Sequence, residues 1–365
     1  MGQIIPLSAN TLQSAITLNS VTTCEPDFSN LLRTSQMNNT QDIRFQQLQQ
    51  WLQNFVTDKT YSLKPASSDA SFRRYFRLTQ QHGSLIVMDS PPEHEDNQAF
   101  IKVATLLEQY GLNVPHIYQQ DLQSGFLILN DLGNTPYLSQ LSATTADELY
   151  KNAIDNLITL QKIPIENQLL PKYDAALLER EMRLFDDWFL QTHLKLTPPD
   201  WLTATYDLLI DNALSQPQVL VHRDFHSRNL MFLPGKAPGI IDFQDAVIGA
   251  ISYDLVSLLR DVYIQWSPAE QQQWVTYYIE QAQQHRLLTS EQAEHFPRWF
   301  DLMGLQRHLK ILGIFCRLNY RDNKPNYIND LAVTLNYVYQ VCERYPELQK
   351  LYQYLIEQPK IAAIK

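Results

Sequence analysis

The stretch LVHRDFHSRNLMF, residues 220–232, places two histidines, two arginines, an aspartate and an asparagine between apolar ends. Asp224 and Asn229 lie five residues apart within it. An aspartate beside an acceptor hydroxyl can orient the hydroxyl and accept its proton, and the carbonyl oxygen of an asparagine is a hard ligand for Mg²⁺. We therefore predict Asp224 as the catalytic base and Asn229 as a metal ligand, with His222 and Arg223 holding the loop through hydrogen bonds.

A second carboxylate follows at a spacing that supports this interpretation. In PGIIDFQDA, residues 238–246, an apolar β-type run leads to Asp242 at a turn. For a single aspartate, capping of buried backbone would be the better explanation. Together, however, Asp224, Asn229 and Asp242 have the order and spacing of the H-R-D-x-x-x-x-N loop and the D-F-G segment of kinases. We predict that Asp242 binds the Mg²⁺ ion that bridges the phosphates of a nucleotide.

The composition narrows the classes of partner. The 365 residues are 44% hydrophobic and 19% charged, which is typical of a globular protein with one large bilobal unit or two domains. The net charge of −10 disfavours nucleic acid or an anionic membrane as a partner. Three scattered cysteines favour a reducing compartment, and neither a membrane-spanning run nor a signal peptide is recognisable, so we expect a cytoplasmic protein. Nothing in the sequence indicates an obligatory protein partner.

The first part of the chain predicts a small antiparallel sheet. Residues 1–44 are polar without a sustained period, which predicts a mobile extension. A packed helix is expected over residues 45–55, with apolar positions that run to Phe55. Residues 61–130 then alternate strand-like and turn-like runs around one helical run, in the order β-β-β-α-β-β. We predict that residues 45–130 form an N-lobe that covers the nucleotide.

Within this N-lobe, the apolar pattern assigns faces to individual residues. In the middle strand, Phe72, Phe76 and Leu78 share the face that is expected to meet the core. In the helix over residues 97–111, Tyr110 is expected to point inward and Gly111 to end the helix.

The second part of the chain is predicted to be mainly helical. Its helix-like runs span residues 147–161, 177–190, 253–266 and 303–320. A short β-rich insert surrounds the opening stretch, and LILNDLG, residues 127–133, is the expected hinge between the two parts. We therefore predict an α+β, bilobal fold whose larger helical C-lobe, residues 131–365, carries the acceptor site and the catalytic loop, HRDFHSRN at residues 222–229.

The segment VLVHRDFHSRNLMFLPGKAPGIIDFQDAVIGAISYDLVSLLRDVYIQW, residues 219–266, resembles the aminoglycoside phosphotransferase and choline kinase-like superfamily. Within it, the chain is most similar to the anomeric N-acetylmuramate/N-acetylglucosamine kinases of bacterial cell-wall recycling. Further support comes from SDASFRRYFRL, IVMDSPPE, LILNDLG and RHLKILGIFCRLNYRDNKPNYI, so the resemblance covers about residues 45–340.

This resemblance implies a protein-kinase-like bilobal fold that binds ATP and Mg²⁺ between its lobes. It implies phosphate transfer to the anomeric hydroxyl of N-acetylmuramate and/or N-acetylglucosamine. It also places Leu129, Asn130 and Asp131 at the hinge beside the adenine, and Asp254 of YDLVSLLRD at a position that braces the catalytic loop in such folds.

The turn that would cover the phosphates departs from the kinase pattern. It reads PASSDAS, residues 65–71, and contains no glycine. Backbone N–H groups and the hydroxyls of Ser67, Ser68 and Ser71 would still provide donors for phosphate, although an ordinary hairpin would use similar residues.

The lysine that usually binds the α- and β-phosphates is also missing. Its strand offers Met88 and Asp89 instead, and the next helix has no well-placed glutamate. A guanidinium can hold phosphate oxygens with two donors, so Arg74 and Arg77 are predicted to contact phosphate. Further candidates are Arg73 and Lys64, and the alternative is that these arginines form a solvated strand face.

A basic stripe marks the helix near the C-terminal end. At 100° per residue, its four cations fall within roughly 80° of one another: Arg307, Lys310, Arg317 and Arg321. Because the rest of the helix is largely apolar, these cations need partners, which are either the protein's own carboxylates or polar groups of a sugar. For the sugar we favour Arg317 and Arg321, and in the catalytic loop His226 and Arg228.

Two alternatives stay open on the sequence alone. In the first, the acceptor is another small alcohol, such as an aminoglycoside or a choline-like compound. In the second, the protein is a nucleotide-binding scaffold without catalysis. The intact set of Asp224, Asn229 and Asp242 favours an enzyme.

Overall fold

The computed structural model describes residues 42–56, 60–67, 72–166 and 170–364. The chain divides into two compact units, Met1–Thr57 and Asp58–Lys365.

In the first unit, helix α2 (Ile43–Leu52) begins at Asp42, whose carboxylate accepts a hydrogen bond from the backbone N–H of Phe45. Leu48 and Leu52 are buried, but Phe55 is 42% exposed because the helix ends before it. The predicted packing of Phe55 is therefore wrong. Most of the predicted N-terminal extension lies outside the described residues.

In the second unit, a five-stranded antiparallel sheet follows the predicted order of elements. Its strands lie in the order β1-β2-β3-β5-β4, and helix α3 connects β3 to β4. Their bounds are β1 Ser62–Ser67, β2 Arg74–Gln80, β3 Gly83–Asp89, α3 Asn97–Gln109, β4 Ile117–Asp121 and β5 Phe126–Asn130. Short turns join β2 to β3 and β4 to β5, so the neighbouring strands pair as hairpins.

The side chains of β2 alternate between the core and a cavity. Phe76 and Leu78 are buried as predicted, while Tyr75 and Arg77 point to the other face and line the cavity described below. Phe72 is 62% exposed because β2 begins two residues after it, so its predicted place in the core is wrong.

At the end of α3, one predicted side-chain orientation is wrong. Gly111 has a φ of +79°, in the left-handed region that favours glycine, and the helix ends at Gln109. Tyr110 therefore lies beyond the last helical residue and is 42% exposed, which contradicts its predicted inward orientation.

The rest of the second unit is mainly helical, as predicted. Its helices are α4 Ala146–Gln161, α5 Ala175–Leu184, α6 Leu202–Leu214, α7 Tyr253–Leu259, α8 Pro268–Gln284, α9 Ser290–Tyr320, α10 Leu331–Arg344, α11 Gln349–Glu357 and α12 Pro359–Ala362. Shorter turns of helix are η1 Tyr137–Ser139, η3 Pro325–Asp330 and η4 Pro346–Leu348, and η2 Phe185–His193 is a π-helix. Two small antiparallel pairs, β6 Gln218–Val221 with β9 Val247–Ala250 and β7 Leu230–Met231 with β8 Gly239–Ile240, flank the catalytic loop.

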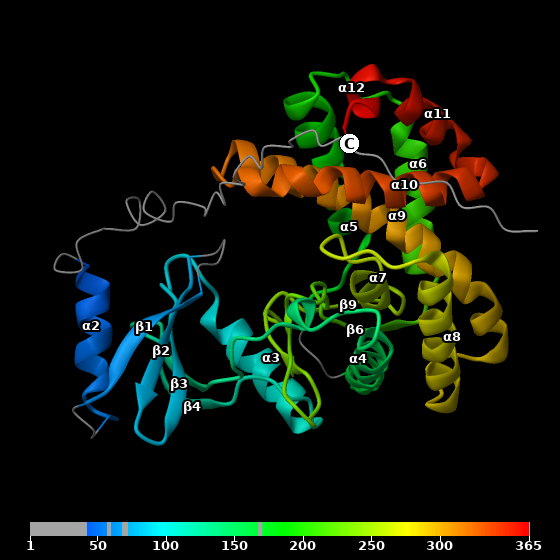
Figure 1. Ribbon diagram of the computed structural model, residues 1–365. Coiled ribbons are helices and arrows are strands. Elements are labelled where there is room, and N and C mark those ends of the chain that lie inside the picture. Colours follow the sequence, from blue (N-terminus) through cyan, green and yellow to red (C-terminus); the bar gives the residue numbers. More distant parts are fainter. Residues whose placement is uncertain (1–41, 57–59, 68–71, 167–169, 365) are drawn as a thin grey trace, which may run out of the picture. The chain divides into compact units, whose positions relative to one another are not determined.

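Helix α9 is the central element of the helical part (Figure 1), because it packs against α5, α6, α7 and α10. It begins with a capping box between Thr289 and Gln292. A Cβ atom on Gly313 would lie 2.3 Å from the backbone of Leu184, so only glycine allows α9 and α5 to approach this closely. The α+β fold class is confirmed. None of the described helices is long and apolar enough to cross a membrane.

Helix α7 is shorter than predicted. The run over residues 253–266 was expected to be one helix, but it ends at Leu259, where Arg260 leaves the helical conformation. The next residue, Asp261, uses its carboxylate to accept hydrogen bonds from backbone N–H groups of Tyr263 and of Ser227 in the catalytic loop. A side chain that competes for backbone in this way favours a turn over a helix.

Buried His308 of α9 predicts how stability depends on pH. Its ring stacks on Tyr337 of α10, Nε2 donates to the carbonyl of Arg260, and burial lowers its pKa to about 3. Because the unfolded state takes up a proton near pH 6.5, this contribution to stability is complete above that pH and is lost as the pH falls toward the folded-state pKa. Lowering the pH from 7 to 5 should cost about 2 kcal/mol through this residue alone.

A variant without a titrating group tests this prediction. The measurement is urea unfolding of the wild-type protein and of His308→Gln at pH 7 and pH 5. The wild type should be the more stable protein at pH 7, and its advantage should shrink by about 2 kcal/mol at pH 5. An equal advantage at both values would show that His308 does not titrate in this way.

Candidate active site

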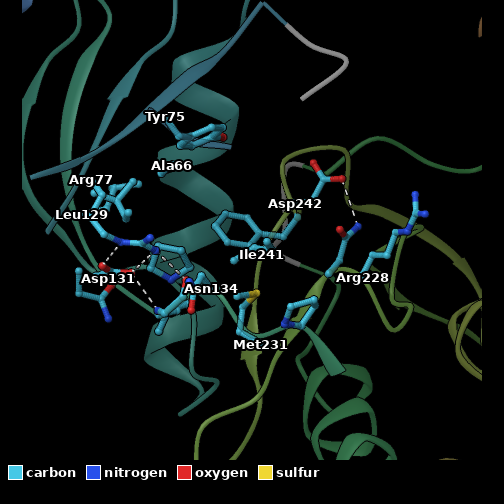
Figure 2. Close-up of a pocket in the computed structure, with 18 of the residues that line it drawn as sticks. Ala66, Tyr75, Arg77, Leu129, Asp131, Asn134, Arg228, Met231, Ile241 and Asp242 are labelled. Carbon is cyan, nitrogen blue, oxygen red and sulfur yellow. Dashed lines mark hydrogen bonds and ion pairs between the residues drawn. The ribbon is translucent and has the colours of Figure 1, made fainter. Parts of the chain in front are cut away.

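A cavity of about 410 Å³ lies between the sheet and the catalytic-loop segments of the second unit (Figure 2). Its apolar wall includes Tyr75, Ile86, Leu129, Met231 and Ile241. The predicted hinge residues Leu129, Asn130 and Asp131 line it on one side, and Arg228, Asn229 and Asp242 line it on the other. An apolar slot with a few polar groups at its ends is typical of a site for a small ligand.

The hinge end of the cavity is fixed by an ion pair. The carboxylate of Asp131 accepts hydrogen bonds from Arg77 Nε at 2.6 Å, from Ser84 Oγ at 2.6 Å and from the backbone N–H of Gly133 at 2.9 Å. Burial alone would raise the pKa of Asp131, but the hydrogen bonds from Arg77 and Ser84 lower it. Arg77 and Asp131, both predicted to contact the nucleotide, therefore bind each other in this structure.

The catalytic loop is held by its own polar residues. Buried Asp254 of α7 accepts hydrogen bonds from the backbone N–H groups of His222 at 2.7 Å and Arg223 at 2.9 Å. His222 Nε2 donates to the carbonyl of Ile241 at 3.1 Å, and its Nδ1 accepts from the backbone N–H of Asp224 at 3.2 Å. These contacts also hold Arg223 at a φ of +78°, a conformation that costs energy for a residue other than glycine.

The two predicted metal ligands lie side by side. Asn229 Nδ2 donates to the backbone carbonyl of Asp224 at 3.0 Å and to Asp242 Oδ2 at 3.2 Å. Gln244 Nε2 donates to the other oxygen of Asp242 at 2.7 Å, and Asp242 has a φ of +67°. One carboxylate and one amide are a hard-oxygen donor set that fits Mg²⁺, which takes its remaining ligands from phosphates and water. Among the described residues, no cluster of three or more His, Cys, Asp or Glu side chains offers an alternative metal site.

The side chain of Asp224 is 44% exposed and has a cation beside it. Arg307 Nη2 of α9 lies 3.7 Å from Asp224 Oδ1, and Arg307 Nη1 donates to the carbonyl of Arg223 and to the hydroxyl of Tyr253. Loss of solvent around the loop would raise the pKa of Asp224, but the charged groups around it, with Arg307 the strongest, together lower the pKa to about 2. Asp224 is therefore a carboxylate that is able to accept a hydrogen bond from a hydroxyl.

The four cations of the basic stripe on α9 differ in their partners. Buried Lys310 donates to Glu181 of α5 at 2.8 Å, so one of the protein's own carboxylates partners it. Arg321 is exposed and pairs with its neighbour Asp322, while Arg317 is half-buried with no hydrogen-bond partner for its Nε among the described residues. The member of the stripe that lies beside the catalytic loop is Arg307, whereas sequence reasoning favoured Arg317 and Arg321.

Two residues that contact the loop, Asp261 and Tyr263, were missed from the sequence. Asp261 accepts hydrogen bonds from both the backbone N–H and the hydroxyl of Ser227. The guanidinium of Arg228 lies 3.5 Å above the ring of Tyr263, and His226 meets the same ring edge to face. The signal that would have found Asp261 is the motif YDLVSLLRD, in which a second aspartate follows Asp254 by seven residues.

The predicted phosphate contacts are only partly described. Ser68 and Ser71 lie outside the described residues, and so does the side chain of Ser67. Arg74 donates to Asp89 at 2.9 Å, so its guanidinium already has a carboxylate partner.

Three comparisons bear on the family. Residues 62–288 match the phosphotransferase enzyme family. An N-acetylmuramate/N-acetylglucosamine kinase from Pseudomonas putida is 43% identical over 330 residues, which is 87% of this chain and 97% of that one. A kinase of the same name from Neisseria meningitidis is 43% identical over 319 residues, or 85% and 94% of the two chains. An ethanolamine kinase from Plasmodium vivax shares the fold at 13% identity, with a TM-score of 0.63 over 88% of this chain and 95% of that one.

These findings agree with the motifs and the geometry. The kinase-like fold is confirmed by the solved structure, and the resemblance drawn from residues 219–266 is confirmed by relatives that match along most of their length. The chain belongs to the phosphotransferase enzyme family.

Proposed function

We propose that the protein is a kinase that transfers the γ-phosphate of ATP to the anomeric hydroxyl of N-acetylmuramate, N-acetylglucosamine or both, in the recycling of cell-wall sugars in the cytoplasm. The observation that carries the proposal is the 3.2 Å contact between Asn229 and Asp242, next to Asp224, in a chain 43% identical to kinases named for these two sugars. Phosphoryl transfer needs such an arrangement of base and metal ligands.

The predicted base and the two predicted metal ligands have separate roles in this reaction. The carboxylate of Asp224 would accept a hydrogen bond from the anomeric hydroxyl and take its proton as the hydroxyl oxygen bonds to the γ-phosphorus. The bond between that phosphorus and the oxygen it shares with ADP breaks in the same step, so ADP leaves with that bond's electron pair. Asn229 and Asp242 would hold Mg²⁺, which when bound offsets the negative charge of the phosphates.

The remaining residues are assigned to binding of the nucleotide, binding of the sugar and support of the loop. The adenine would lie beside Leu129, Asn130 and Asp131, with residues 45–130 as the covering lobe and residues 131–365 as the lobe that holds the acceptor. Ser67, Ser68 and Ser71 would contribute to phosphate binding, and His226, Arg317 and Arg321 to sugar binding. His222, Arg223 and Asp254 would support the loop, as their hydrogen bonds suggest.

The function is tested by measuring Mg²⁺-dependent ADP release across a panel of acceptors. N-acetylmuramate and N-acetylglucosamine should support turnover, and their products should no longer react as reducing sugars because the anomeric carbon carries the phosphate. The matched control is the 1-O-methyl glycoside of N-acetylglucosamine, which lacks only the anomeric hydroxyl and should support none.

The panel also contains the rival acceptors. An aminoglycoside, choline and ethanolamine should give no ADP release above the rate without an acceptor. Turnover with one of them but with neither amino sugar would refute the proposed substrate class, and equal turnover with the methyl glycoside would refute the anomeric position.

A further inference from the structure

The chain lacks the lysine that usually offsets the charge of the nucleotide phosphates, and the structure shows what replaces it. Met88, at that place on β3, is fully buried and belongs to the same apolar core as Phe100 and Phe243. The rings of Phe100 and Phe243 stack with their centroids 5.0 Å apart. Because Met88 is apolar and buried, the positive charge has to come from another element.

Most nearby arginines already have anionic partners. Among the described residues that line the cavity, the arginines are Arg77 and Arg228. Arg77 is bound to Asp131 at the hinge. At the start of β2, Arg74 is bound to Asp89. Arg73, just before β2, forms an ion pair with Glu95 at 2.8 Å. Arg228 is therefore the cation whose surroundings decide the question.

Arg228 is held in place without using its hydrogen-bond donors. The carbon Cζ of its guanidinium lies over the ring of Tyr263, 3.5 Å from the ring centroid. Stacking occupies one face of the guanidinium and leaves the N–H groups at its edges available. Within residues 42–56, 60–67, 72–166 and 170–364, no hydrogen bond or ion pair engages this side chain.

The backbone around Arg228 is fixed on both sides. Ser227 is bound to Asp261 through its N–H and its hydroxyl, and Asn229 is bound to Asp242. In Figure 2, Arg228 lies beyond Asp242 as seen from the hinge residue Asp131. A nucleotide whose base lies at the hinge would therefore extend its terminal phosphate toward Asp242 and Arg228.

We propose that Arg228 is a catalytic residue that donates hydrogen bonds to the transferring phosphoryl group, and that Tyr263 positions it. Arg228 supplies positive charge to a site without the strand lysine, but to the terminal phosphate and not to the α- and β-phosphates that such a lysine binds. This inference rests on the proposed kinase function. As the bond to the leaving ADP oxygen breaks and the bond to the acceptor oxygen forms, Arg228 offsets the charge on the phosphoryl oxygens and exchanges no proton with them.

The test compares Arg228→Ala and Arg228→Lys with the wild type, using both amino sugars. Arg228→Ala should lower kcat about 100-fold or more with either sugar, while the KM for each sugar changes less than about threefold. Arg228→Lys should recover only part of the loss, because an ammonium group cannot make the paired contacts of a guanidinium. Guanidine added to Arg228→Ala should raise its kcat.

Nucleotide binding supplies a second readout. Arg228→Ala should bind ADP as the wild type does, but should bind a non-hydrolysable ATP analogue more weakly, because only the analogue carries the terminal phosphate. The matched control is Arg298→Ala. It removes an arginine of the N-terminal part of α9 whose Cζ lies 5.0 Å from the ring centroid of Tyr345, and it should leave kcat unchanged. Tyr263→Phe should retain most of the activity and Tyr263→Leu should lower kcat.

The outcomes separate this inference from the proposed function. A loss confined to the KM for N-acetylmuramate would show that Arg228 binds the carboxylate of that sugar and would overturn the inference. Unchanged kcat in Arg228→Ala would also overturn it. If the wild type used neither sugar, the proposed function would fail, while equal loss of ADP and analogue binding would count against Arg228 independently.

Discussion

Replacing Asp224 with asparagine should lower kcat by about 10²- to 10⁴-fold and leave ADP binding nearly unchanged. Asparagine has the same shape but cannot take the proton of the acceptor hydroxyl, so the step loses its base. The loop itself should survive, because the backbone around residue 224 is held by Asp254 and His222 and not by the Asp224 side chain. ADP binding should be nearly unchanged because Asp224 is not among the described residues that line the cavity. Steady-state kinetics and calorimetric titration with ADP measure the two effects separately.

The control for this substitution is Asp245→Asn, which makes the same chemical change at an exposed position near Asp242. It should keep wild-type turnover. If Asp224→Asn and Asp245→Asn had similar kcat values, Asp224 would not be the base.

The sheet was predictable because its determinants are local. Phe76 and Leu78 alternate with Tyr75 and Arg77, and short turns join the strands, so few arrangements of an antiparallel sheet were available. Where the prediction for the sheet and for α3 was wrong, a residue lay one or two positions outside its element. Phe72 precedes its strand and Tyr110 follows its helix, and period alone does not fix where an element ends.

From residue spacing alone, the candidate site was predictable only where the chain itself brings its residues together, whereas the places of the hinge and of Asp254 came from the resemblance to known kinases. Asn229 and Asp242 lie on neighbouring short strands or turns, so their contact follows from one hairpin. The approach of Arg307 to Asp224 depends instead on how α9 packs against α5 and α7, which a single sequence does not reveal. For the same reason, helical spacing alone could not show that Lys310 pairs with Glu181 while Arg307 lies beside Asp224.

The largest predicted effect on stability concerns Glu181. This buried carboxylate of α5 accepts hydrogen bonds from Arg223 of the catalytic loop, Lys310 of α9 and the hydroxyl of Tyr173. Burial alone would raise the pKa of Glu181, but Lys310 and Arg223 lower it, so the group is ionised near neutral pH. Glu181→Gln would leave two buried cations without a carboxylate partner, which should lower the free energy of unfolding by about 3 kcal/mol. Urea denaturation at pH 7 measures this loss.

A matched substitution on the same helix separates burial from charge. Glu179 pairs with Arg183 at 3.0 Å, but its side chain is 48% exposed, so Glu179→Gln should cost less than about 1 kcal/mol. Adding Lys310→Met to Glu181→Gln removes one of the two unpaired cations, and should return at least about 1 kcal/mol of the loss. Equal stability of the two glutamine variants would mean that Glu181 does not neutralise the buried cations. In that case the position of the catalytic loop would depend on its other contacts, such as those with Asp254, Asp261 and Arg307.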